Sequence, residues 1–250
     1  MDASCHARGS ATWSPEAERA RLEEVAEWYD SRVGLNRDLV RHAAGLIVAG
    51  ARGSRALELG CANGVMTQEL APRFERLDVV EAIGRYADYA RRFVPRGGQV
   101  YQCLFEEFRP SIHYDVIVMA WILEHVADPQ GLLARARNWL GSEGRIHIVV
   151  PNAESLHRQV GMAMGLIGRL TELNPADSAI GHRRVYSWDT LAADIAGADL
   201  KLATMEGILL KPLSNTLMET WPRDLRAAFF QLSSLVPRLC SEIYAVCELP

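Results

Sequence analysis

Residues 56–64 read ALELGCANG, a short apolar run that leads into a loop of small residues. Such a run predicts a buried strand, and the glycines at 60 and 64 predict a tight turn at its end. The next segment, GVMTQELAPRF, has large apolar residues four positions apart, which is typical of a helix facing a core. The stretch therefore predicts a strand, a glycine loop and a helix in succession.

The same alternation continues along the chain and predicts an open α/β fold. Helical patterns such as RYADYARRFV and PQGLLARARNWL separate the apolar runs, so right-handed crossovers should build a parallel sheet covered on both faces. The five expected strands are RALELG (55–60), LDVVEA (77–82), VYQCLF (100–105), YDVIVMAW (114–121) and RIHIVV (145–150).

Two further strand-like runs lie near the end of the sequence, KLATMEGILLK (201–211) and SEIYAVCEL (241–249). A helical stretch at about 215–239 separates them. We expect these runs to form an antiparallel pair at the sheet edge, because neither requires another parallel crossover. The prediction is thus a seven-stranded, mostly parallel sheet.

The remaining segments suggest how the chain is organised. Residues 1–52 should form a tail and a helical cap: a small, polar and disordered first dozen residues, a helix opened by Ser14-Pro15, and a second helix at about 38–48. Residues 53–250 should form the binding core. Within this core, alternation stops at about 153–186, which predicts a lid inserted after the fifth strand.

Composition favours a small-molecule partner. The chain of 250 residues is 49% apolar and carries a formal net charge of −4, so no overall positive field attracts nucleic acid or anionic membranes. Five cysteines show no metal-binding spacing and are expected to be reduced thiols. The sequence starts without a signal-peptide pattern, and no run approaches a membrane span. We therefore expect a cytoplasmic protein; the oligomeric state is not predicted.

The glycine loop does not match the common phosphate-binding motifs. Ala62 and Val65 stand where a dinucleotide fingerprint needs glycine, which disfavours a nicotinamide-dependent oxidoreductase, and no Gly-Lys-Ser/Thr follows. Glu58, just before the turn, suits an ammonium or sulfonium group. Glu81, seventeen residues past Gly64, stands where a carboxylate can accept both hydroxyls of a ribose. Together these acids favour a nucleoside with a cationic tail.

ALELGCANG, VVEA, LFEEF and DVIVMAWILEHVADP together resemble the motifs of class I S-adenosylmethionine-dependent methyltransferases, in particular the subgroup that acts on small molecules such as quinones and natural products. The resemblance covers residues 55–152 and implies a Rossmann-like fold with S-adenosylmethionine as cofactor. The cofactor-binding residues that it implies are Glu58, Gly60, Cys61, Gly64, Glu81, Ala82, Leu104, Phe105, Glu106, Ala120 and Trp121.

The resemblance also implies a role for each part of this set. Glu58 and the two glycines would surround the methionine end, Glu81 would hold the ribose, Leu104 and Phe105 would flank the adenine, and Ala120 and Trp121 would face the sulfonium. The sequence departs from the family at two points. The aspartate often found near the adenine is replaced by Cys103 or Leu104, which leaves backbone contacts and Glu106, and Ala62 replaces a glycine.

Candidate catalytic residues lie in the insertion. His182 is the first candidate for a general base, with His157 and Tyr186 as alternatives, because a hydroxyl or protonated amine must lose a proton during methyl transfer. His182 could instead brace the lid. Arginines in the same segment would either bind an anionic acceptor group or be solvated lid charges; they are Arg158, Arg183 and Arg184.

Several residues and absences narrow the reaction. Residues 119–121 read Met-Ala-Trp, without the acidic ligands of metal-assisted methyltransferases, so no metal is expected. An Asn/Asp-Pro-Pro-aromatic motif is also missing there, which disfavours DNA and protein-glutamine substrates. Cys61 is expected to pack rather than to act as a nucleophile. Glu124 and His125 are expected to begin the helix after the fourth strand.

The sequence therefore predicts methyl transfer from S-adenosylmethionine to a small-molecule acceptor. An oxygen nucleophile of a metabolite or natural product is the first choice, and nitrogen or carbon remains an alternative. A non-catalytic partner protein that binds S-adenosylmethionine also stays open.

Overall fold

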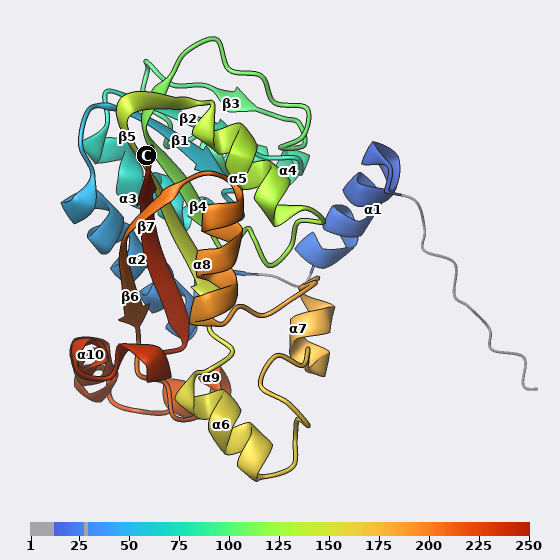
Figure 1. Ribbon diagram of the computed structural model, residues 1–250, viewed down its shortest axis with the longest axis vertical. Helices are drawn as coiled ribbons and strands as arrows, with labels where there is room; N and C mark the ends of the chain where they lie inside the picture. The colour runs from blue at the N-terminus through green and yellow to red at the C-terminus, as the bar shows by residue number, and fades with distance from the viewer. Residues whose placement is uncertain (1–12, 28–29) are drawn as a thin grey trace, which may run out of the picture.

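The computed structural model describes residues 13–27 and 30–250, so the predicted disordered tail lies outside the described residues. Two helices precede the sheet, α1 (Pro15–Ala26) and α2 (Gly34–Gly50). The hydroxyl of Ser14 accepts a hydrogen bond from the Ala17 N–H at 3.2 Å, and Pro15 occupies the first turn, as the sequence predicts. Helix α1 projects from the body of the molecule beside α7 (Pro175–Ala179) (Figure 1).

Seven strands form one sheet in the order β3-β2-β1-β4-β5-β7-β6, which confirms the predicted fold class. All neighbours are parallel except β7, which is antiparallel to both β5 and β6. The late strand β7 therefore lies inside the sheet, and β6 forms the edge. The strands are β1 (Arg55–Leu59), β2 (Arg76–Val80), β3 (Val100–Tyr101), β4 (Tyr114–Ala120), β5 (Leu140–Pro151), β6 (Lys201–Ile208) and β7 (Glu242–Glu248).

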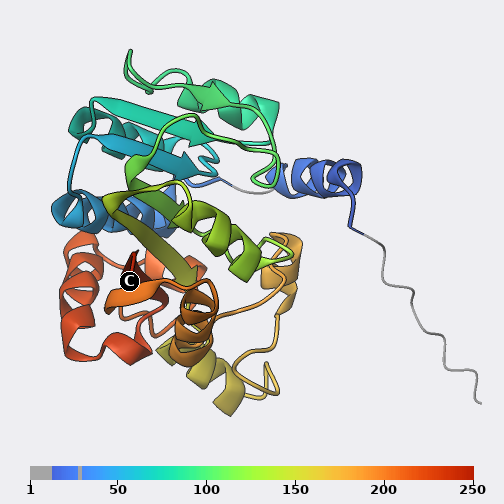
Figure 2. The same ribbon diagram turned by 45° about the horizontal axis from the view of Figure 1, so that its top comes forward.

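Helices cover both faces of the sheet (Figure 2). Along β4, Ile117 and Met119 point into one buried cluster with α5 (Pro129–Arg137) and α8 (Trp188–Gly197). The alternate residues Val116 and Val118 join the cluster on the other face. That second cluster includes α2, α3 (Val65–Leu70) and α4 (Gly84–Ala90). Because both faces are covered, the central strands are apolar throughout.

Several boundaries differ from those the sequence predicts. Strand β3 ends at Tyr101 because the chain turns there, and the Leu104 N–H donates to Glu107 Oε2 at 2.9 Å. Strand β5 begins at Leu140 instead of 145. Glu124 and His125 precede helix α5, whose cap is Asp128. The expected helix at 215–239 is interrupted by Pro222 and consists of α9 (Asn215–Glu219), α10 (Arg223–Gln231) and two 3₁₀ turns, η2 (Leu232–Leu235) and η3 (Pro237–Leu239).

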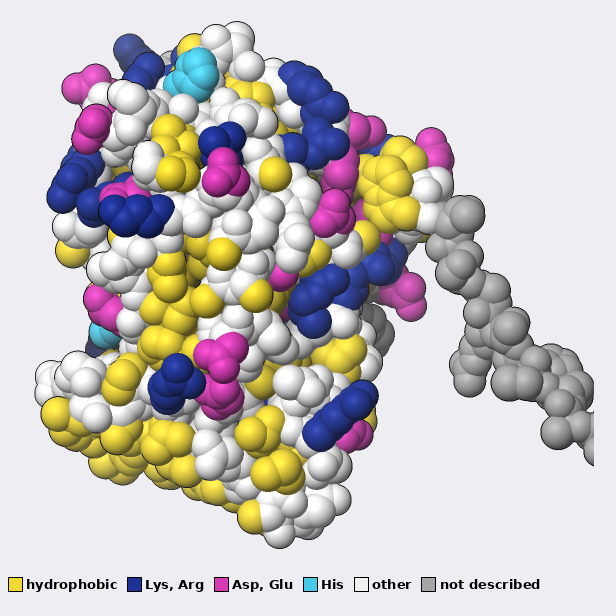
Figure 3. Space-filling view, viewed as in Figure 1, with side chains coloured by type: hydrophobic (Ala, Val, Ile, Leu, Met, Phe, Trp, Pro, Cys, Tyr) yellow, Lys and Arg dark blue, Asp and Glu magenta, His cyan; other side chains and the backbone are white. Residues whose placement is uncertain are grey.

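The segment after β5 contains α6 (Leu156–Ala163) and α7, and it rejoins the body where Asn152 pairs with Tyr186 in an isolated bridge. Apolar side chains gather at the end of the molecule formed by α6, α9 and α10 (Figure 3). Among the described residues, no helix combines the length and the apolar character needed to span a membrane. The exposed large apolar residues in these helices, just after α6 and in η2 are Met162, Met164, Leu166, Leu217, Leu225, Leu232 and Leu235.

Candidate active site

A cavity of about 770 Å³ opens at the carboxyl ends of β1, β2 and β4. This is the edge of an open α/β sheet where ligands bind, beside the strand at which the order reverses. Every residue of the expected cofactor set except Gly64 lines the cavity. The residues that the sequence analysis assigns to the cofactor, apart from Gly64, therefore share one cavity.

The glycine loop bends because its backbone enters the left-handed region. Gly60 has a φ of +70°, and a Cβ there would lie 2.5 Å from the Cδ1 of Ile122, so only glycine fits. Ala62 has a φ of +43°, an uncommon angle for a residue with a side chain. Gly64, at +77°, begins α3 and packs toward Tyr89 and Phe93 instead of the cavity. Gly64 thus supports the loop on the side that faces away from the cavity.

Glu58 is a buried carboxyl on the cavity wall. Its Oε2 accepts a hydrogen bond of 2.7 Å from the Thr67 hydroxyl, whereas Oε1 has no hydrogen-bond partner among the described residues. Burial raises the pKa of Glu58 to about 8. A buried oxygen of this kind fits a ligand with an ammonium group, which would supply the missing donor and favour the charged carboxylate.

Glu81 is held by the backbone around it. Its Oε1 accepts from the Ile83 N–H at 2.9 Å, and its Oε2 accepts from the Cys61 N–H at 3.1 Å. A carboxylate has about four acceptor positions, so both oxygens can still accept from ribose hydroxyls. Burial raises the pKa of the Cys61 thiol well above its usual value, which agrees with a packing role for Cys61.

The third part of the cofactor side is an apolar wall. Ala82, Leu104 and Phe105 line the cavity together with Glu106. The backbone carbonyl of Glu106 accepts a hydrogen bond of 2.7 Å from Arg109, which holds this turn after β3 in place. A flat aromatic base fits such a wall, and Glu106 is the nearby acid that the sequence analysis names.

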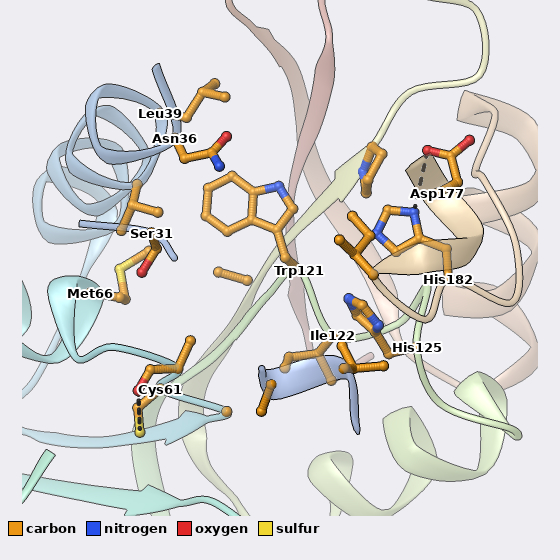
Figure 4. A pocket seen from close by; sticks show the side chains of 18 of the residues that line it. Ser31, Asn36, Leu39, Cys61, Met66, Trp121, Ile122, His125, Asp177 and His182 are labelled. Carbon is orange, nitrogen blue, oxygen red and sulfur yellow. Dashed lines mark hydrogen bonds and ion pairs between the residues drawn. The ribbon is translucent and has the colours of Figure 1, made fainter. Parts of the chain in front are cut away.

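Trp121 lies between the two sides of the cavity (Figure 4). Its φ of +57° is unusual for a large residue, and its backbone N–H donates to Val149 at 2.7 Å. The indole N–H donates to Glu242 Oε2 at 3.0 Å. Strain at a cavity wall is typical of a functional position, and here it directs the indole into the cavity beside Ala120.

His157 and His182 both line the far side of the cavity. Burial lowers the pKa of His182 to about 4 and that of His157 to about 2, so both imidazoles are neutral near pH 7. Asp177 Oδ1 lies 3.7 Å from Nδ1 of His182. Two neutral imidazoles therefore face the space beyond Trp121.

Of the other candidates from the insertion, only Arg158 lines the cavity. Tyr186 does not line it, and its hydroxyl donates to Asp194 at 2.9 Å, so the structure removes Tyr186 from the candidate bases. All three arginines form hydrogen bonds within the protein. Arg158 donates to Asp177 at 3.0 Å, Arg183 to Glu18 at 2.7 Å, and Arg184 to the carbonyls of Leu123 and Val126 at 2.6 and 2.7 Å.

Three polar residues of this wall are absent from the expected set: Lys211, Asn215 and Glu242. Lys211 is half-buried, and its ammonium donates to Asn215 Oδ1 at 2.7 Å. Burial raises the pKa of Glu242 to about 7. Lys211 follows the run KLATMEGILL, and Glu242 starts the strand β7. Charged residues at the ends of apolar strands were the available signal, because such ends meet at the ligand edge of the sheet.

Comparisons with known proteins agree with this architecture. A family model described as a methyltransferase domain matches residues 28–204. Nodulation protein S of Rhizobium tropici is 30% identical over 146 residues, which cover 53% of this chain and 60% of that protein. This chain thus spans less than two thirds of that relative. The ubiquinone biosynthesis O-methyltransferase of Idiomarina loihiensis is 23% identical over 219 residues, which cover 85% of this chain and 84% of that protein.

A solved structure shows the same fold with ligands present. The 1,6-didemethyltoxoflavin-N1-methyltransferase of Burkholderia thailandensis, with bound 1,6-didemethyltoxoflavin and S-adenosylhomocysteine, is similar at a TM-score of 0.63 and 17% identity. The match covers 97% of this chain and 93% of that one. Since the family model matches more than half of the sequence, the chain belongs to the methyltransferase-domain family.

Proposed function

We propose that the protein methylates an oxygen nucleophile of a small metabolite or natural product. The observation that carries this proposal is the cavity of about 770 Å³, which continues past Trp121 to a wall with two neutral imidazoles. Pockets for small ligands measure roughly 300–1,000 Å³. When bound, S-adenosylmethionine supplies a methyl group on a positively charged sulfur that departs as a neutral thioether.

On the cofactor side of the cavity, each part of the wall would contact a different part of S-adenosylmethionine. Glu58 accepts from the ammonium through its unpartnered Oε1. Glu81 accepts from the ribose hydroxyls, and Leu104 and Phe105 lie against the adenine. Trp121 separates the cofactor from the acceptor and limits the positions that the acceptor can take.

The acceptor side combines segments that are distant in sequence. Residues 153–186, which we propose as a lid, contribute His157, Asp177 and His182. Helix α2 contributes Asn36 and Leu39 from the opposite side (Figure 4). An enclosed position of this kind excludes water and aligns the acceptor with the methyl group, which is the main requirement for transfer from a sulfonium.

An oxygen acceptor fits the neutral imidazoles. A hydroxyl must lose its proton as its oxygen bonds to the methyl carbon. The imidazole lone pair of His182 is the better acceptor for that proton, because burial lowers the pKa of His182 less than that of His157. Support for oxygen also comes from the ubiquinone biosynthesis O-methyltransferase. The toxoflavin enzyme is named as an N1-methyltransferase, so nitrogen is the alternative that the test must separate.

The test is turnover of S-adenosylmethionine by the purified full chain with matched acceptors. Phenols, catechols and aliphatic alcohols are compared with amines of the same skeleton, and S-adenosylhomocysteine formation is measured. Mass spectrometry of the product shows which atom carries the methyl group. We expect methylated oxygen; methylation of the amines alone would overturn the choice of oxygen.

A further inference from the structure

Three potential metal ligands meet beside the acceptor side of the cavity. Glu124 and His125 follow β4, and His182 comes from the end of the insertion. One ligand atom from each of the three lies within 4.8 Å of the others. The rings of His125 and His182 meet edge to face, with centroids 4.8 Å apart and an angle of 79° between their planes (Figure 4). The fold thus joins residues that are almost sixty positions apart.

Glu124 is the unusual member of this cluster. Its side chain is fully buried, and neither carboxyl oxygen has a hydrogen-bond partner among the described residues. The nearby guanidinium of Arg184 donates to the carbonyls of Leu123, Val126 and Ala127 instead. A buried carboxyl without partners is costly, and proteins normally pair such a group or use it to coordinate a metal.

The protein holds the two segments of the cluster together. The Arg183 N–H donates to the Glu124 carbonyl at 2.8 Å, and Nε of Arg183 donates to the His125 carbonyl at 2.8 Å. Arg21 of α1 also donates to the His125 carbonyl, at 3.2 Å. On the other side, Asp177 Oδ1 lies 3.7 Å from Nδ1 of His182, which is too long for a hydrogen bond. The backbone of the cluster is therefore held in place before an ion binds, whereas the side chains can still move.

We propose that Glu124, His125 and His182 bind one divalent transition-metal ion of the zinc type. Two imidazole nitrogens and one carboxylate are a ligand set of catalytic zinc sites, which keep a further position open, whereas magnesium and calcium prefer oxygen ligands. Ligand atoms at about 2.0–2.2 Å from zinc lie closer together than 4.8 Å, so the side chains must converge by roughly 1 Å on binding. His125 and His182 line the cavity, and the open position therefore faces the acceptor.

This site deepens the proposed function and rests on it for its role in catalysis. An ion beside the acceptor would lower the pKa of a hydroxyl bound to it, and the hydroxyl proton would pass to water. The lone pair of His182 would then coordinate the ion and would not be available to accept a proton. The expectation of no metal came from residues 119–121, but the ligands begin at Glu124, three residues further along.

Metal binding can be measured without turnover. The full chain is dialysed against a chelator and titrated with Co²⁺, followed by visible absorption, and with Zn²⁺ in a calorimeter. We expect one ion per chain, and at least a hundredfold weaker binding in Glu124→Gln and in His182→Ala. Glu143→Gln and His113→Ala replace exposed residues of the same types and should bind the ion like the wild type. Affinity for S-adenosylhomocysteine, measured in parallel, reports whether each variant is folded.

Two results would overturn the site: no ion bound by the wild type, or equal binding by the wild type and both ligand variants. If Glu124→Gln fails to fold, His182→Ala alone decides, because its side chain lies at the cavity edge. Turnover is compared with and without Zn²⁺. Equal rates of oxygen methylation in the two states would overturn the metal's role and leave the proposed function standing, whereas bound metal without methylation of any oxygen would count against the proposed function.

Discussion

The two sides of the cavity are built in different ways. The cofactor side comes from one continuous part of the chain, between Glu58 and Trp121, where parallel strands end next to one another. The acceptor side combines α2, the segment 153–186, Lys211 and Glu242. Local sequence determines the first side, whereas the second exists only after distant segments have packed. The two sides should therefore respond separately to mutation.

We expect His182→Ala to show the largest difference between its effect on the methyl-transfer rate and its effect on cofactor affinity. The methyl-transfer rate should fall about a hundredfold or more, because a general base or an acceptor-activating ligand contributes at least that factor. The affinity for S-adenosylmethionine should stay within about twofold, since His182 lies beyond Trp121. Single-turnover kinetics and calorimetry measure the two quantities, with His113→Ala as the control. A joint loss of rate and cofactor affinity would contradict separate sides.

Glu81→Ala should show the opposite pattern. Loss of charge-assisted bonds to two hydroxyls should weaken cofactor binding by roughly thirtyfold, or about 2 kcal/mol. The rate at saturating cofactor should change much less. Calorimetry with S-adenosylhomocysteine checks the affinity, and Glu75→Ala, at an exposed position next to β2, is the matched control. Unchanged affinity in Glu81→Ala would remove Glu81 from the cofactor site.

Glu58→Gln should alter stability in a pH-dependent way. The folded protein raises the pKa of Glu58 to about 8, so the stabilisation from this proton is complete below the unfolded pKa of about 4.3 and is lost as the pH rises through 8. Glutamine does not titrate. Without cofactor, the variant should therefore melt about 3 °C or more above the wild type near pH 8.5, with a smaller difference near pH 5.

Bound cofactor should reduce this difference in melting temperature. Near pH 7.5, S-adenosylmethionine should raise the melting temperature of the wild type more than that of Glu58→Gln, because an ammonium favours the charged carboxylate. Scanning calorimetry measures both effects. If the cofactor stabilised the two proteins equally, Glu58 would not contact the ammonium.

The smallest effect is expected from Ala62→Gly. Ala62 has a φ of +43°, so glycine should relieve a backbone cost of about 1 kcal/mol and raise the melting temperature slightly. Ala51→Gly is the control, because Ala51 has a φ of −70° and should lose stability. A lower melting temperature in Ala62→Gly would show that the methyl group of Ala62 packs usefully in the loop.

The difference between the two sides also explains what the sequence could predict. The succession of strands along the chain and the cofactor wall follow from apolar runs, strand ends and glycine positions, which are local signals. Tyr186 was misjudged because its place in the segment 153–186 does not reveal that its hydroxyl turns to Asp194. Arg158 and Asp177 pair across that segment, and Glu124 meets His182 only in the folded chain. Contacts of this kind join distant segments, and no periodic pattern in the sequence predicts them.

The position of β7 between β5 and β6 affects how the protein is completed during synthesis. Residues 242–248 are synthesised after the other six strands of the sheet. Strand β6 nevertheless joins the sheet only by pairing with β7. Glu242 at the start of β7 also accepts the hydrogen bond from the indole N–H of Trp121. A chain truncated before residue 242 would therefore contain the glycine loop but would lack Glu242 on the acceptor wall, and β6 would have no partner strand.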